Sequence, residues 1–245
     1  MDLIWSIILG LIQGLTEFLP VSSSGHLVIA QHFIPGFSQP GVLFDVVLHL
    51  GTLFAVVYFF RKKILTLSRQ YYLLLIIGTI PAGLFGILFQ KSLESTFGDY
   101  KMVGIELIIT GILNFLIDKA NTAKDKITYE NSLLIGIGQA TAIIPGISRS
   151  GTTIFTGVKL GIDRKKAAEF SFLLSIPAIL GANIIQIISH GLSNIPNPLY
   201  YFVGFLAALL SGVLSIRLVF KTLSEKKFGI FGIYCIVLGV LVLLF

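Results

Sequence analysis

The chain has 245 residues, 55% of them hydrophobic and only 12% charged, with a net charge of +6 and a mean hydropathy of +0.91. A soluble domain of this length could not bury so much apolar surface, which excludes the soluble classes and indicates a membrane protein. Its apolar runs are continuous rather than alternating, so we expect an all-α polytopic fold and not a β-barrel. The single cysteine, Cys235, excludes an internal disulfide.

The chain begins with two short apolar stretches, Leu3–Ile12 and Leu27–Ile34, on either side of a segment rich in Pro, Ser and Gly. The same pattern returns at Leu133–Ile144 and Thr153–Leu160. None of these stretches is long enough to cross a bilayer, which requires about 20 apolar residues. A short helix, a break and a second short helix are typical of a re-entrant hairpin, which enters and leaves the membrane by one face.

Six longer apolar runs follow the two hairpins in groups of three, and each is predicted to form a transmembrane helix. They are Val42–Phe60, Tyr71–Phe89, Met102–Ile117, Phe170–Ile188, Leu199–Val219 and Phe228–Phe245. The third run is short, so we expect its helix to extend further or to tilt. The whole chain, 1–245, is therefore interpreted as a single integral membrane domain.

An internal repeat relates the two halves of the chain. Moving the sequence by 126 positions places Gln13 on Gln139 and aligns SSSG at Ser22–Gly25 with SRSG at Ser148–Gly151. Each half, about 1–118 and about 127–245, then contains one hairpin and three spans. Because three is an odd number of crossings, the second half is expected to be inverted relative to the first, as in many transporter folds.

The basic residues are distributed very unequally between the two predicted faces. Fifteen Lys and Arg residues lie in the loops of one face, and only Lys91 and Lys101 lie on the other. The positive-inside rule assigns the basic face to the cytoplasm. We therefore expect both termini outside, the first hairpin entering from the outer face and the second from the cytoplasm. Arg149 belongs to neither face.

The first hairpin contains polar groups that are costly inside a membrane. Gln13 and Glu17 are four residues apart and share a helix face, and the segment that follows ends in His26. A charged residue at the bilayer centre costs about 2.5–3.5 kcal/mol on insertion scales, so Glu17 is expected to be functional. The Ser-rich breaks of the two hairpins can each cap the helix that follows them.

Two capped helix N-termini meeting within the membrane would favour an anion, because their N–H groups and dipoles are positive there. Arg149 adds a guanidinium suited to phosphate, and Gly25 and Gly151 would allow the backbone to approach it closely. Ser23 could be a nucleophile or a phosphate ligand, and either Glu17 or His26 could be the base. Glu17 could instead hold a divalent cation. The other expected phosphate-binding residues are Gln13, Ser22, Ser24, Ser148, Ser150 and Thr152.

Simpler interpretations of these residues remain open at this stage. Glu17 and Arg149 could be a buried ion pair that only joins the hairpins, and individual serines could merely pack or cap. Asp45 and His49, again four residues apart, are secondary candidates that could face the same cavity, as is Gln139. The spacing of these residues does not by itself distinguish hydrolysis from binding.

The motifs resemble those of a known family. The (E/Q)xxxE pattern at Gln13–Glu17, VSSSGH ending at His26 and PGISRSG ending at Gly151 resemble the signatures of the undecaprenyl-diphosphatase family of the bacitracin-resistance type. HLGTLFAVV at His49–Val57 and AAEFSFLLSIPA at Ala167–Ala178 are also similar to that family. The resemblance covers essentially the whole chain.

The resemblance implies hydrolysis of a C55 polyprenyl diphosphate to the monophosphate carrier of cell-wall synthesis. By motif position, it implies catalytic roles for Glu17, Ser23, His26 and Arg149. Gln13 stands where Glu is also allowed, which leaves Glu17 as the only carboxylate of that motif. We expect a divalent cation, Mg²⁺ or Ca²⁺, and no organic cofactor.

The expected setting is the bacterial cell membrane, with the active site open to the outer face and bacitracin competing for the lipid substrate. Membrane lipids are the other expected partners, nucleic acid is not, and a homodimer is left open. Two other functions remain possible for this chain. A secondary transporter or flippase could carry a polyprenyl phosphate through the same anion site, and a non-catalytic membrane partner would not need Glu17.

Overall fold

The computed structural model describes residues 3–34, 43–89, 100–120, 122, 124–190 and 197–244. Val42, Lys91 and Phe245, which the predicted spans and loops include, lie outside these residues. The described chain is all-helical, as predicted. Its helices are α1 (Leu3–Phe18), α2 (Ser23–Phe33), α3 (Leu43–Ile64), α4 (Arg69–Leu88), α6 (Tyr100–Lys119), α7 (Tyr129–Thr141), α8 (Arg149–Lys159), α9 (Arg164–His190), α10 (Pro198–Ser224) and α11 (Gly229–Leu244).

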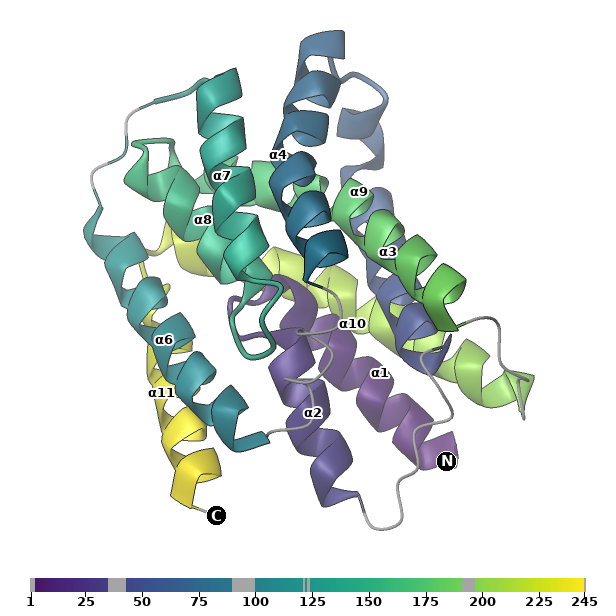
Figure 1. Ribbon diagram of the computed structural model, residues 1–245. Helices are drawn as coiled ribbons and strands as arrows, with labels where there is room; N and C mark the ends of the chain where they lie inside the picture. Colours follow the sequence, from purple (N-terminus) through teal and green to yellow (C-terminus); the bar gives the residue numbers. More distant parts are fainter. Residues whose placement is uncertain are drawn as a thin grey trace.

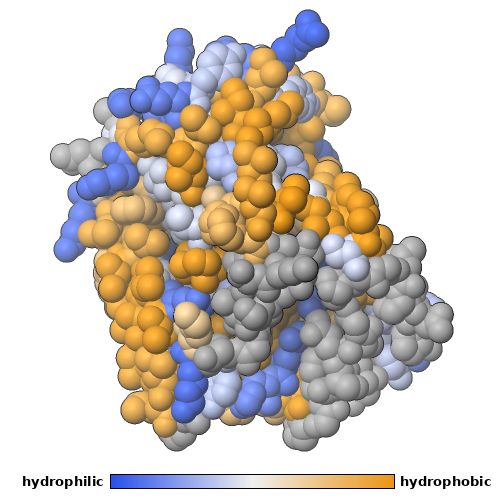
Figure 2. Space-filling view, viewed as in Figure 1, coloured by the Kyte–Doolittle hydropathy of each residue, from blue (hydrophilic) through white to orange (hydrophobic). Residues whose placement is uncertain are grey.

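Long apolar helices confirm the membrane class of the protein. Among the described residues, α3, α4, α6, α9 and α10 are long and apolar enough to cross a bilayer. Helix α6 extends beyond the predicted run at both ends, whereas α11 has 16 described residues, about 24 Å at the α-helical rise. Hydrophobic side chains cover much of the surface in Figure 2, and hydrophilic ones project along its upper edge. The chain is a polytopic α-helical membrane protein.

A pair of short helices lies at each position where a hairpin was predicted. Helices α1 and α2 pack against each other in the lower half of Figure 1, α7 and α8 do so in the upper half, and the two breaks meet at the centre. Each second helix is capped as expected, because the Ser22 hydroxyl accepts from the Gly25 amide at 3.3 Å and the Ser148 hydroxyl from the Gly151 amide at 3.1 Å. Both ends of the described chain lie at the lower end of the molecule (Figure 1).

Each hairpin packs on a long helix from the other half of the chain. Helix α1 lies along α10, with Gly10 against the backbone of Gly204, and α7 lies along α4, with Gly136 against the backbone of Gly78. Only glycine allows such close contact, since an added Cβ would collide with the neighbouring backbone. The two contacts are equivalent in the repeat, because Gly136 follows Gly10 by 126 positions and Gly204 follows Gly78 by the same number.

Helices α6 and α11 form an antiparallel pair on the same principle. Gly104 contacts Gly239, and Gly111 contacts Gly232 one heptad further along α6. Small residues at such spacing let two helix backbones approach without a side chain between them. The pair lies beside the two hairpins (Figure 1), so polar groups on α6 and α11 can reach the hairpin breaks.

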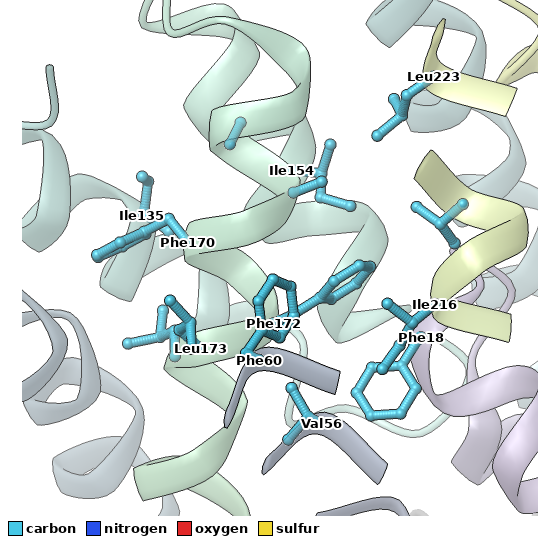
Figure 3. Close-up of a cluster of buried hydrophobic side chains, with 14 of the residues drawn as sticks. Phe18, Val56, Phe60, Ile135, Ile154, Phe170, Phe172, Leu173, Ile216 and Leu223 are labelled. Carbon is cyan, nitrogen blue, oxygen red and sulfur yellow. The ribbon is translucent and has the colours of Figure 1, made fainter. Parts of the chain in front are cut away.

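An aromatic and aliphatic core fixes the end of α1. Phe18 packs edge-on against Phe172 of α9 with ring centroids 5.4 Å apart, and both side chains are fully buried. Figure 3 shows Phe18 beside Val56 and Phe60 of α3 and Ile216 of α10. Because Phe18 immediately follows Glu17, this packing determines where the only carboxylate of the first motif lies.

Candidate active site

Glu17 is the centre of the candidate site. Its side chain is buried, with the residue 8% exposed, and both of its oxygens are engaged. Arg149 donates to Oε1 at 2.5 Å, while Oε2 accepts from the Ser23 hydroxyl at 2.6 Å and from the Gln13 amide at 3.0 Å. One carboxylate thus joins the two hairpins, and the predicted meeting of Glu17, Ser23 and Arg149 is present in the structure.

The positions of Ser23 and Arg149 explain how both reach the same carboxylate. Ser23 is the first residue of α2 after its cap, and Arg149 is the first residue of α8 after its cap. They are 126 positions apart and are therefore equivalent in the repeat. The N-termini of both helices point toward the break region, so the site combines a hydroxyl, a guanidinium and two positive helix ends.

His26 is directed toward Tyr234 of α11. Its Nδ1 lies 2.7 Å from the Ser22 carbonyl oxygen, and its Nε2 lies 2.7 Å from the Tyr234 hydroxyl. His26 was one of the two candidate bases, and both of its ring nitrogens contact groups other than the Ser23 hydroxyl. His26 is therefore oriented by the turn before it, and Glu17 is the candidate base in contact with Ser23.

Ser22 has an unusual backbone that supports this orientation. Its φ angle is 69°, a region that non-glycine residues rarely adopt, and its side chain is buried. The carbonyl of Ser22 accepts from both the Nδ1 and the backbone N–H of His26. The hydroxyls of Ser22 and Ser24 lie 3.3 Å apart, and Gly25 is buried against Val103 and Gly146. Strain of this kind is often found at functional sites, and here it turns the carbonyl toward the imidazole.

In the second hairpin, the expected phosphate ligands are engaged with protein. The Ser148 hydroxyl caps α8, the Ser150 hydroxyl donates to the Leu19 carbonyl at 3.1 Å, and the Thr152 hydroxyl donates to the Ser148 carbonyl at 2.8 Å. The Gly151 amide donates to Ser148. Of these residues Ser150 bonds the first break, while the other bonds lie within the second hairpin, and the neighbouring Arg149 reaches Glu17.

Helix α6 supports both breaks through polar residues that the sequence analysis did not include in the site. Asn114 donates to the Pro20 carbonyl at 2.6 Å, and Thr110 accepts from the Ser148 amide and donates to the Gly146 carbonyl, both at 3.0 Å. Thr110 and Asn114 are four residues apart and buried on one face of α6. This spacing of two polar residues in an apolar span was the feature of the sequence that could have indicated their role.

The secondary candidates lie in two different places. His49 is close enough to Glu17 for an electrostatic interaction, although its Nδ1 bonds the backbone carbonyl of Asp45 rather than the carboxylate. The Asp45 side chain accepts from Gln31 of α2 at 3.5 Å. Gln139 is buried between α7 and α4, where it donates to the Gly78 carbonyl at 3.3 Å. His49 thus borders the site, and Gln139 serves helix packing.

A protein cage for a metal ion is absent from the described residues, which contain no group of three or more His, Cys, Asp or Glu side chains that could hold one. Glu17 and the neighbouring Gln13 nevertheless offer oxygen ligands. The Gln13 Oε1 atom is buried and has no hydrogen-bond partner in the described chain. One carboxylate and one amide oxygen fit the way Mg²⁺ is held when a substrate's phosphates supply most other ligands.

The arrangement suits phosphoryl transfer. A hydroxyl 2.6 Å from a buried carboxylate can act as a nucleophile with that carboxylate as its base, and the guanidinium beside it can stabilise phosphoryl oxygens. Two helix N-termini add further positive potential where negative charge would develop.

Comparison with known proteins agrees with this geometry. The family model described as "Bacitracin resistance protein BacA" matches residues 6–241. Proteins named undecaprenyl-diphosphatase are similar to the chain over nearly its full length. The one from Methanobrevibacter smithii is 40% identical over 270 residues, covering 99% of this chain and 97% of that protein. The one from Syntrophotalea carbinolica is 40% identical, covering 98% and 97%, and the one from Thermosipho africanus is 41% identical, covering 96% and 97%. The chain therefore belongs to the BacA bacitracin resistance protein family.

Proposed function

We propose that this chain is a membrane phosphatase that hydrolyses undecaprenyl diphosphate to undecaprenyl phosphate and inorganic phosphate. The relatives carry the name of that activity, and family membership extends over 6–241. The observation that carries the proposal is the contact of Ser23 and Arg149 with the two oxygens of Glu17. Such hydrolysis would recycle the lipid carrier for cell-wall synthesis and give resistance to bacitracin, which competes for the substrate.

In the first step, the Ser23 hydroxyl attacks the terminal phosphorus of the diphosphate. Glu17 takes the hydroxyl proton, the bond from the phosphorus to the bridging oxygen breaks, and undecaprenyl phosphate leaves. In the second step, water displaces the phosphoryl group from Ser23, and the proton on Glu17 returns to the serine oxygen. The 2.6 Å distance between Ser23 Oγ and Glu17 Oε2 supports this assignment of the base.

The ion pair between Glu17 and Arg149 has a direct role in this scheme. A guanidinium binds phosphate at least as well as it binds a carboxylate, because both present oxygens to its planar donors. An incoming terminal phosphate would therefore draw Arg149 away from Glu17. Glu17 Oε1 would then be open to a divalent cation, while Oε2 keeps its contact with the Ser23 hydroxyl.

A divalent cation is proposed at the same point. Glu17 Oε and the unpartnered Gln13 Oε1 would hold it together with the diphosphate oxygens. A bound Mg²⁺ or Ca²⁺ would neutralise charge on the diphosphate during transfer.

The proposed architecture has six crossings and two re-entrant hairpins, arranged as inverted repeats of about 1–118 and about 127–245. Three packing contacts support it. Helix α1 runs parallel to α10, α7 runs parallel to α4 at equivalent positions, and α6 runs antiparallel to α11. In the first two contacts, the first helix of each hairpin lies parallel to a long helix of the other half. In the third contact, α6 and α11, the last helices of the two halves, run in opposite directions.

The proposed location is the bacterial cell membrane, with both termini outside and the site open to the outer face. The fifteen-to-two distribution of basic residues supports this orientation. A test replaces Cys235 by Ser and introduces one cysteine at exposed His32 or exposed Lys62. A membrane-impermeant maleimide applied to intact cells should label His32→Cys and not Lys62→Cys, and the opposite labelling would reverse the orientation.

The activity is tested with purified protein in detergent and synthetic undecaprenyl diphosphate. We expect release of inorganic phosphate, loss of that release in Ser23→Ala, and inhibition by a chelator that Mg²⁺ or Ca²⁺ reverses. Rapid quenching followed by mass mapping should find a phosphoryl group on Ser23. Substrate binding without phosphate release under any divalent cation would contradict the enzyme and favour a lipid carrier. Phosphate release without modification of Ser23 would favour direct attack by water.

A further inference from the structure

Tyr234 is a polar residue of α11 that contacts the candidate site from 208 positions away in the sequence. Its hydroxyl lies 2.7 Å from His26 Nε2, and the two rings are nearly parallel, at 10° with centroids 5.6 Å apart. The next residue, Cys235, is buried, with its sulfur 3.7 Å from the Pro20 carbonyl in the first break. Helix α11 therefore contacts the first hairpin at two consecutive positions.

The partners of His26 determine which nitrogen carries its proton. The Ser22 carbonyl can only accept, so His26 Nδ1, 2.7 Å away, must donate to it. In the neutral imidazole, Nε2 then has a free lone pair and accepts from the Tyr234 hydroxyl. The donor and the acceptor of both hydrogen bonds, from Tyr234 to His26 and from His26 to Ser22, are thereby assigned from the chemistry of the groups.

We propose that Tyr234 is a positioning residue that acts through His26 in the step where water displaces the phosphoryl group from Ser23. It holds the imidazole as the Nδ1–H tautomer with its basic nitrogen toward α11. When water enters between them, the Tyr234 hydroxyl and Nε2 both bond it, and Nε2 takes its proton as the new oxygen–phosphorus bond forms. The bond from phosphorus to Ser23 Oγ breaks, the proton held by Glu17 returns to that oxygen, and Nε2 passes its proton to the departing phosphate, which restores the neutral imidazole. This inference rests on the proposed function.

The location of Tyr234 distinguishes this role from simple packing. The residue is 45% exposed on a helix whose other exposed side chains are apolar, so its hydroxyl is not enclosed by a core that demands a partner there. A tyrosine in that position could turn its hydroxyl toward the membrane surface, as interfacial tyrosines commonly do. Instead the hydroxyl is directed at a histidine whose other nitrogen is fixed by the strained Ser22 carbonyl.

The test is a double-mutant cycle of Tyr234→Phe with His26→Gln, measured as phosphate release from undecaprenyl diphosphate. Tyr234→Phe keeps the ring and removes only the hydroxyl. Its kcat should fall about tenfold with KM changed less than about twofold, because the loss affects a chemical step rather than binding. In the His26→Gln background the same change should have no further effect, because Tyr234 acts through the imidazole. The matched control is Tyr58→Phe, an exposed tyrosine of α3 outside the site, which should keep normal turnover.

A spectroscopic measurement accompanies the kinetics. With ¹⁵N-labelled histidine, the Nε2 signal that disappears in His26→Gln should shift in Tyr234→Phe, because that nitrogen loses its donor. An unchanged kcat in Tyr234→Phe would overturn the inference, and so would an equal fall in both backgrounds. If Tyr234→Phe is normal while His26→Gln is inactive, only the role of Tyr234 is lost. If His26→Gln keeps full turnover, the proposed step through His26 fails, and if the native protein releases no phosphate, the proposed function itself fails.

Discussion

The two hairpins have the same local construction and different chemistry. In both, a serine caps the second helix through the amide three residues on, and the first residue of that helix contacts Glu17. Beyond this shared frame they differ. Glu17 and His26 of the first hairpin correspond in the repeat to Ile143 and Thr152 of the second, which have no comparable acid–base capacity.

In the proposed mechanism, this difference assigns the acid–base chemistry to the first hairpin and a supporting role to the second. The first hairpin supplies the acid, the hydroxyl and the imidazole, and its Ser23, Ser24 and His26 remain partly exposed. The second hairpin supplies one cation, and its Ser148 and Ser150 are buried in bonds to the backbone. A repeated architecture therefore provides two helix ends for one anion, while only one copy needs to keep reactive side chains.

Ser23→Ala should have the largest effect if the first hairpin carries the chemistry. Removing a nucleophile that forms a covalent intermediate typically lowers kcat by at least about 10⁴-fold. Phosphate release measured at saturating substrate checks this, with substrate binding unchanged as evidence that the variant is folded. A loss below about tenfold would mean that the hydroxyl is only a ligand.

Glu17→Gln should follow, with a fall in kcat of about 10³-fold, since a general base typically contributes 10²–10⁴-fold. The neutral amide cannot take the Ser23 proton, and it also frees Arg149 from its partner. Glu225→Gln, in the exposed loop between α10 and α11, is the control and should retain native turnover. Native-like activity of the Glu17 variant would place the base elsewhere.

Arg149→Lys tests what the second hairpin contributes to activity. The guanidinium bonds Glu17 through one nitrogen and the Ser171 carbonyl through another at 3.4 Å, and an ammonium cannot reproduce both directions. We expect a folded protein with kcat reduced about 10²-fold, the typical loss for one oxyanion donor. Arg217→Lys on the exposed face of α10 should behave as the native protein. Turnover near normal in Arg149→Lys would remove Arg149 from the phosphate site.

Ser150→Ala should give the smallest effect on activity and a measurable one on stability. Its hydroxyl donates to the Leu19 carbonyl between the two breaks, and one such bond contributes about 1 kcal/mol. Thermal unfolding in detergent should shift downward while kcat stays within about twofold of native. A large fall in kcat at unchanged stability would show instead that both hairpins share the chemistry.

Much of the frame follows from sequence because it depends on local rules. Apolar runs, breaks and Ser caps are short-range features. The buried charge of Glu17 requires a partner, and Arg149 was the one basic residue that belonged to neither predicted face. The direction of His26 was not predictable in the same way. It depends on the φ angle of Ser22 and on whether α2 starts at Ser23 or Ser24, which periodicity does not determine.

The long-range supports of the site were also missed. Tyr234 is one polar residue in an apolar helix, and nothing local to it indicates that its hydroxyl meets a histidine 208 positions earlier. Asn114 and Thr110 did leave a signal, as two polar residues on one face of an apolar span. Their target, the backbone carbonyls of the breaks, has no side-chain signature at all.

The pairing of α1 with α10 has a consequence for biosynthesis. Gly10 and Gly204 are 194 positions apart, and a ribosome adds about 5–20 residues per second, so the partner of the first helix emerges about ten to forty seconds after it. During that interval the newly inserted first hairpin lacks α10, and for most of it the acidic side chain also lacks Arg149. A membrane chaperone or the insertion machinery itself would have to bind that hairpin until α10 has been synthesised.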